Sequence, residues 1–224
     1  MRTRTTRLLT RWALITASIA ALLFLSAGTT HVTSIRRYLA VSSALLLVTM
    51  LAVDPHLAQE RAHPRDAGID DELRFAAGFF YLITLTVAAL SVGRLRPFFN
   101  VPISIRDTAL VVYALSNSLQ TWAMIVNPFF SPVVRVQAER GHDVIAHGPY
   151  HFVRHPGYLA MSICVPASAI AIGSWLALTP AATFVFVIVQ RARLEDRFLT
   201  SSLNGYRTYA HRVKAGLFPR IRIP

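Results

Sequence analysis

Charged residues are scarce in this sequence. Only 15% of its 224 residues are charged, whereas soluble globular domains carry about 25%. Hydrophobic residues make up 54% of the chain, and the mean hydropathy is +0.45. Because the apolar residues also form several long uncharged runs, the composition excludes an ordinary soluble domain and indicates an integral membrane protein.

Acidic residues and cysteine are also rare. The single cysteine, Cys164, cannot form an intrachain disulfide, so cysteine usage does not identify the compartment. The 23 Lys and Arg outnumber the 11 acids and give a formal net charge of +12. The arginines lie at the ends of apolar runs rather than in a stripe. We therefore expect them to contact anionic lipid headgroups, with no nucleic-acid partner.

The common nucleotide-binding and nucleophile motifs are missing. The sequence contains no GxGxxG, no GxxxxGKS/T and no serine in a glycine elbow. Histidines do recur every four residues, at His147, His151 and His155, as metal ligands on one helix would. Glycine and proline residues among them break any such helix, so we expect no metal site.

Uncharged apolar runs predict four membrane-spanning helices in the first 126 residues. A cleaved signal peptide would resemble the first run, but that run is long for a signal core and more runs follow it. The polar stretch 54–72 carries prolines and mixed charges, so we expect a solvated connection there. The four runs are 12–28, 38–53, 75–92 and 108–126.

The longest uncharged run covers the 34 residues 157–190. A single helix of that length would measure about 51 Å, against about 30 Å of hydrocarbon. The run therefore predicts a helical hairpin with its tip at 173–175 and with Thr179 as the N-cap before Pro180. We expect an all-α integral membrane protein with about six membrane-embedded helices, the last two forming this hairpin.

Between the fourth run and the hairpin the pattern is not helical. Prolines interrupt 127–147, and 133–137 looks extended, so we expect a compact loop at the membrane surface. This divides the chain into N-terminal transmembrane helices, 1–126, and a functional core, 127–224, made of the loop, the hairpin and a basic tail.

The distribution of basic residues predicts the orientation. If the N-terminus is cytoplasmic, 18 of the 23 Lys and Arg lie on the cytoplasmic side of the predicted spans. Cytoplasmic loops carry such an excess. We therefore expect both termini, the loop and the basic tail to be cytoplasmic.

Polar residues bracket the hairpin on both sides. Tyr150, His155 and Tyr158 precede or open it, and Arg191 and Glu195 follow it, one turn apart on one helix face. If the hairpin folds back, both groups meet on one membrane face. Residue types alone leave two interpretations open, a ligand site and an Arg191–Glu195 pair that satisfies a helix end.

A series of motifs narrows this choice. In order, they are Gly148-Pro149-Tyr150, Val153-Arg154-His155-Pro156-Gly157-Tyr158, Glu195-Asp196, Gly205-Tyr206-x-x-Tyr209-x-x-Arg212-Val213 and Pro219. Their order and spacing resemble those of the isoprenylcysteine carboxyl methyltransferase family, over roughly 127–219. The earlier spans match only as generic apolar helices. The family usually has two glutamates where this chain has Glu195-Asp196.

The resemblance implies S-adenosylmethionine as the cofactor and a lipid-like acceptor, most simply a carboxylate such as that of a prenylcysteine-type acid. The wider group includes phospholipid N-methyltransferases, so an amine acceptor stays open. The resemblance implies catalytic roles for His155 and Tyr158 and an acceptor contact for Arg191. It implies cofactor contacts at Gln137, His142, Asp143, Val144, Ile145, Tyr150, His155, Pro156, Gly157, Tyr158 and Glu195.

Two other classes of protein remain open. One is a non-catalytic, lipid-binding membrane scaffold that keeps the same fold. The other is a membrane reductase with a related C-terminal fold and a nicotinamide cofactor. Because Tyr150, His155, Tyr158 and Glu195 are all present, decay of the site is not indicated. The sequence identifies neither the acceptor nor the oligomeric state.

Overall fold

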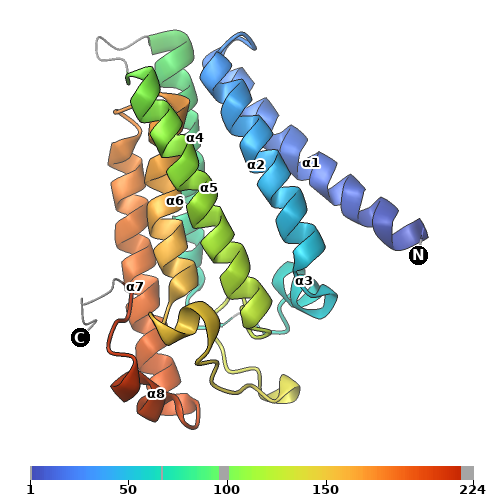
Figure 1. The fold of residues 1–224 in the computed structure, drawn as a ribbon, viewed down its shortest axis with the longest axis vertical. Coiled ribbons are helices and arrows are strands. Elements are labelled where there is room, and N and C mark those ends of the chain that lie inside the picture. The colour runs from blue at the N-terminus through green and yellow to red at the C-terminus, as the bar shows by residue number, and fades with distance from the viewer. Residues whose placement is uncertain (1, 67, 96–100, 218–224) are drawn as a thin grey trace. The chain divides into compact units, whose positions relative to one another are not determined.

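A computed structural model describes residues 2–66, 68–95 and 101–217 of the chain. Within these ranges the chain folds into helices and loops without a β-strand, as the uncharged runs predict (Figure 1). The motif residue Pro219 lies outside the described ranges. The α-helices described are α1 (Arg2–Ala27), α2 (Thr33–Ala52), α3 (Pro55–Ala62), α4 (Asp71–Leu90), α5 (Ile103–Val126), α6 (Pro156–Ile172), α7 (Leu178–Ser202) and α8 (Tyr206–Arg212). A π-helix, η1 (Ser91–Leu95), continues α4, and the 3-10 helices η2 (Ala138–Arg140) and η3 (Gly148–His151) lie in the loop before α6.

Four helical stretches are long and apolar enough to cross a membrane. They are 5–27 of α1, the whole of α2, α4 with η1, and the whole of α5. Helix α6 is apolar but has only 17 residues. The prediction of an all-α membrane protein is confirmed, and the number of six membrane-embedded helices stays a prediction.

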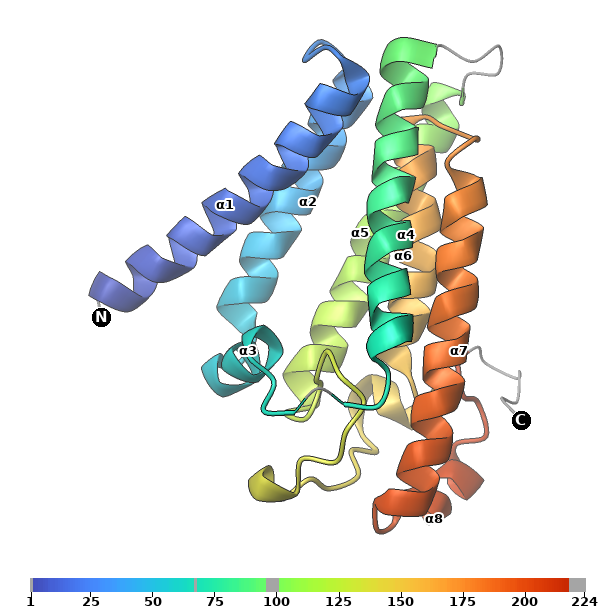
Figure 2. The ribbon, with the colours of Figure 1, turned by 180° about the vertical axis from the view of Figure 1, so that it is seen from behind.

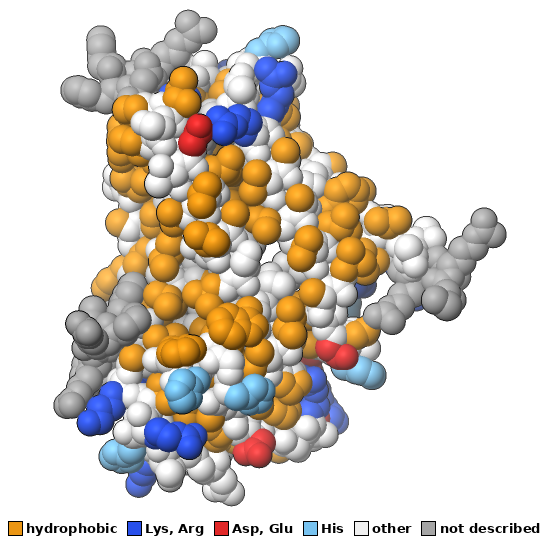
Figure 3. All heavy atoms as spheres, in the orientation of Figure 1, with side chains coloured by type: hydrophobic (Ala, Val, Ile, Leu, Met, Phe, Trp, Pro, Cys, Tyr) orange, Lys and Arg blue, Asp and Glu red, His pale blue; other side chains and the backbone are white. Residues whose placement is uncertain are grey.

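Large hydrophobic side chains are exposed on the surfaces of α1, α4 and α7. Leu25 is 75% exposed, Phe75 is 77% exposed and Phe186 is 62% exposed. Hydrophobic side chains cover much of the face drawn in Figure 3. Such a surface would be unfavourable in water and is favourable against lipid.

The turn between α6 and α7 occupies residues 173–177 and confirms the predicted tip. Gly173 there has a φ of 115°, which favours glycine. The structure does not confirm the predicted N-cap at Thr179. Helix α7 begins at Leu178, so Thr179 lies inside its first turn. Instead, Ser174 Oγ accepts a hydrogen bond from the amide of Ala177, at 3.1 Å.

The expectation of a merely solvated connection at 54–72 was wrong. This stretch contains α3, which begins where Asp54 accepts hydrogen bonds from the amides of His56 and Leu57. Leu57 is fully buried and Asp70 is only 2% exposed. The segment therefore belongs to the folded core and contributes to the site described below.

The chain forms two compact units, each assembled from three segments. The first consists of Met1–Ala52, Phe79–Asn117 and Ile163–Thr183. In it α1 and α2 form a hairpin (Figure 1), and the rings of Tyr38 and Tyr113 pack with their centroids 5.0 Å apart. Its core includes Leu23, Ile35, Leu85 and Ile172.

The second unit consists of Val53–Gly78, Ser118–Ser162 and Phe184–Pro224. Helix α3, the loop 127–147 and α8 lie at the same end of this unit (Figure 2). Two clusters of buried residues hold it together, one around Tyr206 and Tyr209 and one around Leu57 and Met124. The unit draws on both sides of the predicted domain boundary at 126/127, which stays a prediction.

Candidate active site

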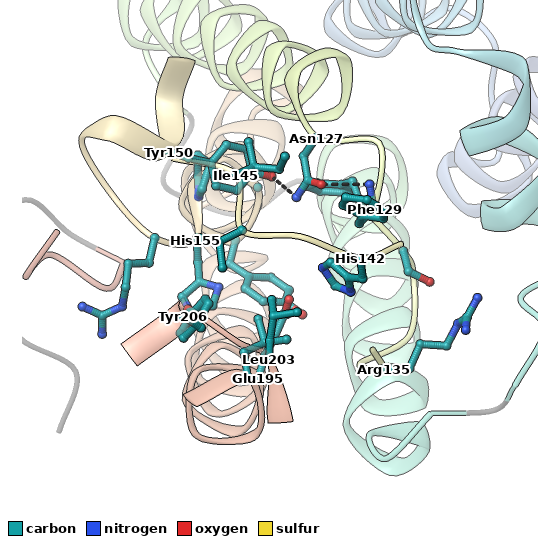
Figure 4. A pocket seen from close by; sticks show the side chains of 18 of the residues that line it. Asn127, Phe129, Arg135, His142, Ile145, Tyr150, His155, Glu195, Leu203 and Tyr206 are labelled. Atoms are coloured by element: carbon teal, nitrogen blue, oxygen red, sulfur yellow. Dashed lines mark hydrogen bonds between the residues drawn. The ribbon is translucent and has the colours of Figure 1, made fainter. Parts of the chain in front are cut away.

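A cavity of about 210 Å³ lies within the second unit. Its walls come from α3, the start of α4, the loop 127–145, the segment 150–161, α7 and α8. Figure 4 shows Glu195 of α7, His142 of the loop and Tyr150 of η3 around this pocket. The residues expected from the resemblance that line the cavity are His142, Asp143, Val144, Ile145, Tyr150, His155, Pro156, Gly157, Tyr158, Arg191 and Glu195.

Gln137, also expected there, is not among the lining residues. Its side chain is fully buried, and its Nε2 donates to the carbonyl of Phe129 at 2.8 Å. Its Oε1 accepts a hydrogen bond from Arg140. Its amide donates to Nδ1 of His142 at 3.2 Å. Gln137 therefore shapes the loop that presents His142.

His142 enters the cavity as a neutral ring. It stacks on Phe129 with centroids 4.4 Å apart. Burial, together with the charges of Arg135 and Arg140, lowers the pKa of His142 to about 4. Because Nδ1 accepts from Gln137, the proton of the neutral ring is on Nε2, which is then a donor.

Asp196 is fully engaged in fixing the segment around His155. Its carboxylate accepts hydrogen bonds from Nε and Nη2 of Arg154 at 2.7 and 2.8 Å, from His155 Nε2 at 3.1 Å and from the Tyr206 hydroxyl at 2.7 Å. Burial would raise the pKa of Asp196, but the hydrogen bonds from His155 and Arg154 outweigh it and hold that pKa well below its usual range. The second acid of the Glu195-Asp196 pair is therefore an ionised structural anchor.

The C-terminal segment is tied to the same point. The amides of Arg154 and His155 donate to the carbonyls of Ala215 and Gly216, at 2.9 and 3.0 Å. The hydroxyl of Tyr209 donates to the carbonyl of Tyr150, at 2.7 Å. The tyrosines of the C-terminal motif thus position the two cavity residues His155 and Tyr150.

Glu195 differs from its neighbour, because no ion pair among the described residues includes it. The Arg191–Glu195 pair that residue types left open is not formed. Arg191 instead donates from both Nε and Nη2 to Asp70, the first bond measuring 2.8 Å. Its guanidinium carbon also lies 5.5 Å from the centre of the Tyr158 ring.

Sequence reasoning missed Asp70, Arg61 and Arg74. Asp70 has a side chain with 0% exposure, and its Oδ1 accepts from the amide of Val134 at 2.9 Å. Arg61 of α3 and Arg74 of α4 line the cavity. These residues lie in a stretch without any motif, so the only signal was an accumulation of charge before the third apolar run.

Part of this chain is similar to a known protein family. Residues 108–201 match the model of the isoprenylcysteine carboxyl methyltransferase (ICMT) family. That match confirms the family resemblance. Two proteins named "Probable protein-S-isoprenylcysteine O-methyltransferase", from Oryza sativa subsp. indica and subsp. japonica, are each 33% identical to this chain over 96 residues. The alignment covers 39% of this chain and 47% of each relative, so the chain spans about half the length of the curated relatives it matches.

The matched segment contains most of the cavity but not all of it. Glu195, Arg191 and the residues from His142 to Tyr158 fall inside 108–201, whereas Arg61, Asp70 and Tyr206 fall outside. The family match therefore includes one wall of the cavity, and the wall formed by α3 and α4 lies outside the match.

Proposed function

We propose that this protein transfers the methyl group of S-adenosylmethionine to the carboxylate of a lipid-like acceptor, such as a prenylcysteine-type acid. The observation that carries the proposal is Glu195. This carboxylate has no ion-pair partner among the described residues, and it lines a cavity with Tyr150 and Tyr158 inside the segment that matches the family.

The residues of the cavity suit the proposed donor. Glu195 would hold its ammonium group through a charge-assisted hydrogen bond. The faces of Tyr150 and Tyr158 would pack against the adenine or the sulfonium, to which aromatic rings are attracted. The Nε2–H of His142 provides a neutral donor at the other end of the loop.

S-adenosylmethionine supplies an electrophilic methyl group on a positively charged sulfur. An acceptor carboxylate is already ionised near neutral pH, so the protein needs no general base for it. In the proposed transfer, one oxygen–carbon bond would form as the carbon–sulfur bond breaks, which would give a methyl ester and the neutral thioether. Since charge is lost along this path, a cavity that excludes water and aligns the two groups favours it.

His155 and Arg191 have supporting roles in this proposal. His155 is 6% exposed and held by Asp196, so it presents a fixed ring to the cavity. Arg191 commits Nε and Nη2 to Asp70, and Nη2 also donates to the carbonyl of Pro132 at 2.8 Å. Its Nη1 takes part in none of these bonds and is the donor left for an acceptor.

Calorimetry of the purified protein with S-adenosylhomocysteine tests the proposal. We expect binding to the parent protein and a loss of roughly a hundredfold in Glu195→Gln, because a charged partner is removed without a change of shape. The control is Glu72→Gln, an exposed acid of the same type at the start of α4. It should bind like the parent.

The same measurement separates the alternatives. Binding of a nicotinamide dinucleotide instead would identify the reductase, and binding of neither ligand would favour the scaffold. Methylation of a phospholipid amine, with no methylation of prenylcysteine acids, would replace the carboxylate acceptor by an amine.

A further inference from the structure

We propose that Arg61, on α3, is the counterion for a ligand carboxylate in this cavity, beside the donor that Arg191 offers. The proposal rests on the proposed function, because it assigns a receptor to a ligand of that reaction. Two ligands carry the required group, the acceptor acid and the amino-acid end of the methyl donor. Arg61 lies outside the segment that matches the family, so nothing in the similarity assigns it.

The argument begins with the arginines that line the cavity. Four of them already have a carboxylate partner, and Arg61 forms no ion pair with any described residue. It is thus the cation whose charge the protein leaves uncompensated. The compensated pairs are Arg74 with Asp71, Arg135 with Glu60 and Glu139, Arg154 with Asp196, and Arg191 with Asp70.

The contacts that Arg61 does make hold it without neutralising it. Its Nη1 donates to the carbonyl of Phe130 at 3.3 Å, and its guanidinium carbon lies 5.1 Å from the centre of the Phe130 ring. Burial lowers the pKa of Arg61, and the nearby charge of Arg191 lowers it further. A partly buried cation without a counterion is costly, so an incoming carboxylate would be bound strongly.

Arg191 also lines the cavity and is the other candidate for binding a ligand carboxylate. Its Nε–Nη2 edge, which could bind a carboxylate through two parallel hydrogen bonds, is occupied by Asp70. Arg61 has no such partner. Among the acids that line the cavity, Glu195 and the exposed Asp143 form no ion pair with a described residue, and among its arginines Arg61 forms none. This pattern fits ligands that bring an ammonium and a carboxylate.

The position of Phe130 gives Arg61 a fixed platform. A Cβ at Gly157 would lie 2.5 Å from Cε2 and Cζ of Phe130, so only glycine lets this ring sit against the start of α6. Phe130 also packs against the cluster of Val53, Leu57 and Met124 beneath α3. The Phe130 ring, against which Arg61 lies, is therefore held between the start of α6 and this cluster.

The experiment compares ligands with and without a carboxylate. Binding of S-adenosylhomocysteine is compared with that of its decarboxylated counterpart, and binding of an N-acyl S-prenylcysteine acid with that of its methyl ester. Each is measured by calorimetry on the full chain in lipid nanodiscs, for the parent and for Arg61→Ala, Arg61→Lys and Arg65→Ala. Arg65 is the matched control, because it is exposed, does not line the cavity and lies four residues further along.

We expect the parent to prefer the carboxylate ligand in at least one pair, by about tenfold or more. Arg61→Ala should abolish that preference, Arg61→Lys should keep part of it because lysine lacks the planar fork, and Arg65→Ala should keep all of it. The pair that loses its preference identifies the source of the carboxylate. If Arg61→Ala does not fold, the reduced preference in Arg61→Lys decides.

An unchanged preference in Arg61→Ala, or no preference in the parent for either pair, would overturn the assignment of Arg61. Neither result would affect the proposed function so long as S-adenosylhomocysteine binds. Conversely, if the parent binds the prenylcysteine acid through Arg61 but binds no S-adenosylhomocysteine, the carboxylate receptor stands and the methyltransferase proposal fails.

Discussion

The ring of His142 stays neutral in the folded loop at a pH where a free histidine would gain a proton. Its pKa is about 4 in the folded loop, against about 6.5 for a free histidine. Between these values the opened loop takes up a proton that the folded loop refuses. The stability of the folded loop is therefore fully present above about pH 6.5 and is lost as the pH falls towards 4.

We accordingly predict that the affinity for S-adenosylhomocysteine falls between pH 7 and pH 5. In His142→Asn the decline should be much smaller, since the amide oxygen can still accept from the Gln137 amide and does not titrate. Calorimetry across this range is the measurement. His151→Asn, at an exposed ring outside the cavity, should decline like the parent, and a flat parent profile would contradict the prediction.

At the scale of single residues, the resemblance singled out more of the residues that line the cavity than residue types alone could. Most of the residues that it implied do line one cavity, with Gln137 as the exception. What the sequence could not separate was Glu195 from Asp196. Two adjacent acids on a helix point in different directions, and only the packed structure shows that Asp196 meets Arg154 and His155 while Glu195 faces the cavity.

Among the elements, the long helices were predictable, because a long apolar run in a membrane must satisfy its own backbone hydrogen bonds and does so as a helix. Helix α3 was not predicted, since it is short and polar. Its start did carry a readable signal, an aspartate N-cap followed by proline at the first helical position. The contact of Asp70 with Arg191 joins residues 121 positions apart, and no local pattern specifies such a pair.

The segment between α3 and α4 is held mainly by Asp70. Its carboxylate binds Arg191 and the amide of Val134, and the amide of Ile69 donates to the carbonyl of Val134 at 3.2 Å. We predict that Asp70→Asn lowers the free energy of unfolding by about 3–5 kcal/mol, because it leaves the buried Arg191 without a counterion.

Thermal or denaturant unfolding in mild detergent measures this effect. Asp66→Asn is the matched control, because Asp66 is 70% exposed and reaches its arginine only at 3.5 Å. Arg135, the partner of Asp66, keeps its shorter ion pairs with Glu60 and Glu139 in this variant, so the variant should unfold like the parent. Equal stability of the two variants would show that Asp70 does not anchor the segment.

At the scale of the whole molecule, the second unit constrains the membrane topology. The segments around Arg61, His142 and Tyr206 line one cavity, so they must lie on the same side of the bilayer. This requirement is independent of charge. The distribution of Lys and Arg then selects the side. By the predicted spans, 18 of the 23 lie on the same side as this cavity, and cytoplasmic segments carry such an excess. Those basic residues would also meet the anionic lipids of the inner leaflet.

We therefore predict that reporter domains fused after Gly68 and after the last residue are both cytoplasmic, and that one fused after His31, between α1 and α2, is external. A phosphatase that is active only outside, paired with a fluorescent protein that folds inside, reads each position. The reporters after Gly68 and after the last residue test the orientation and the shared cavity separately. If both were external, the cavity would keep its integrity and only the orientation would be wrong. If they differed from each other, Arg61 and Tyr206 could not line one cavity, and the site would have to be rebuilt without α3.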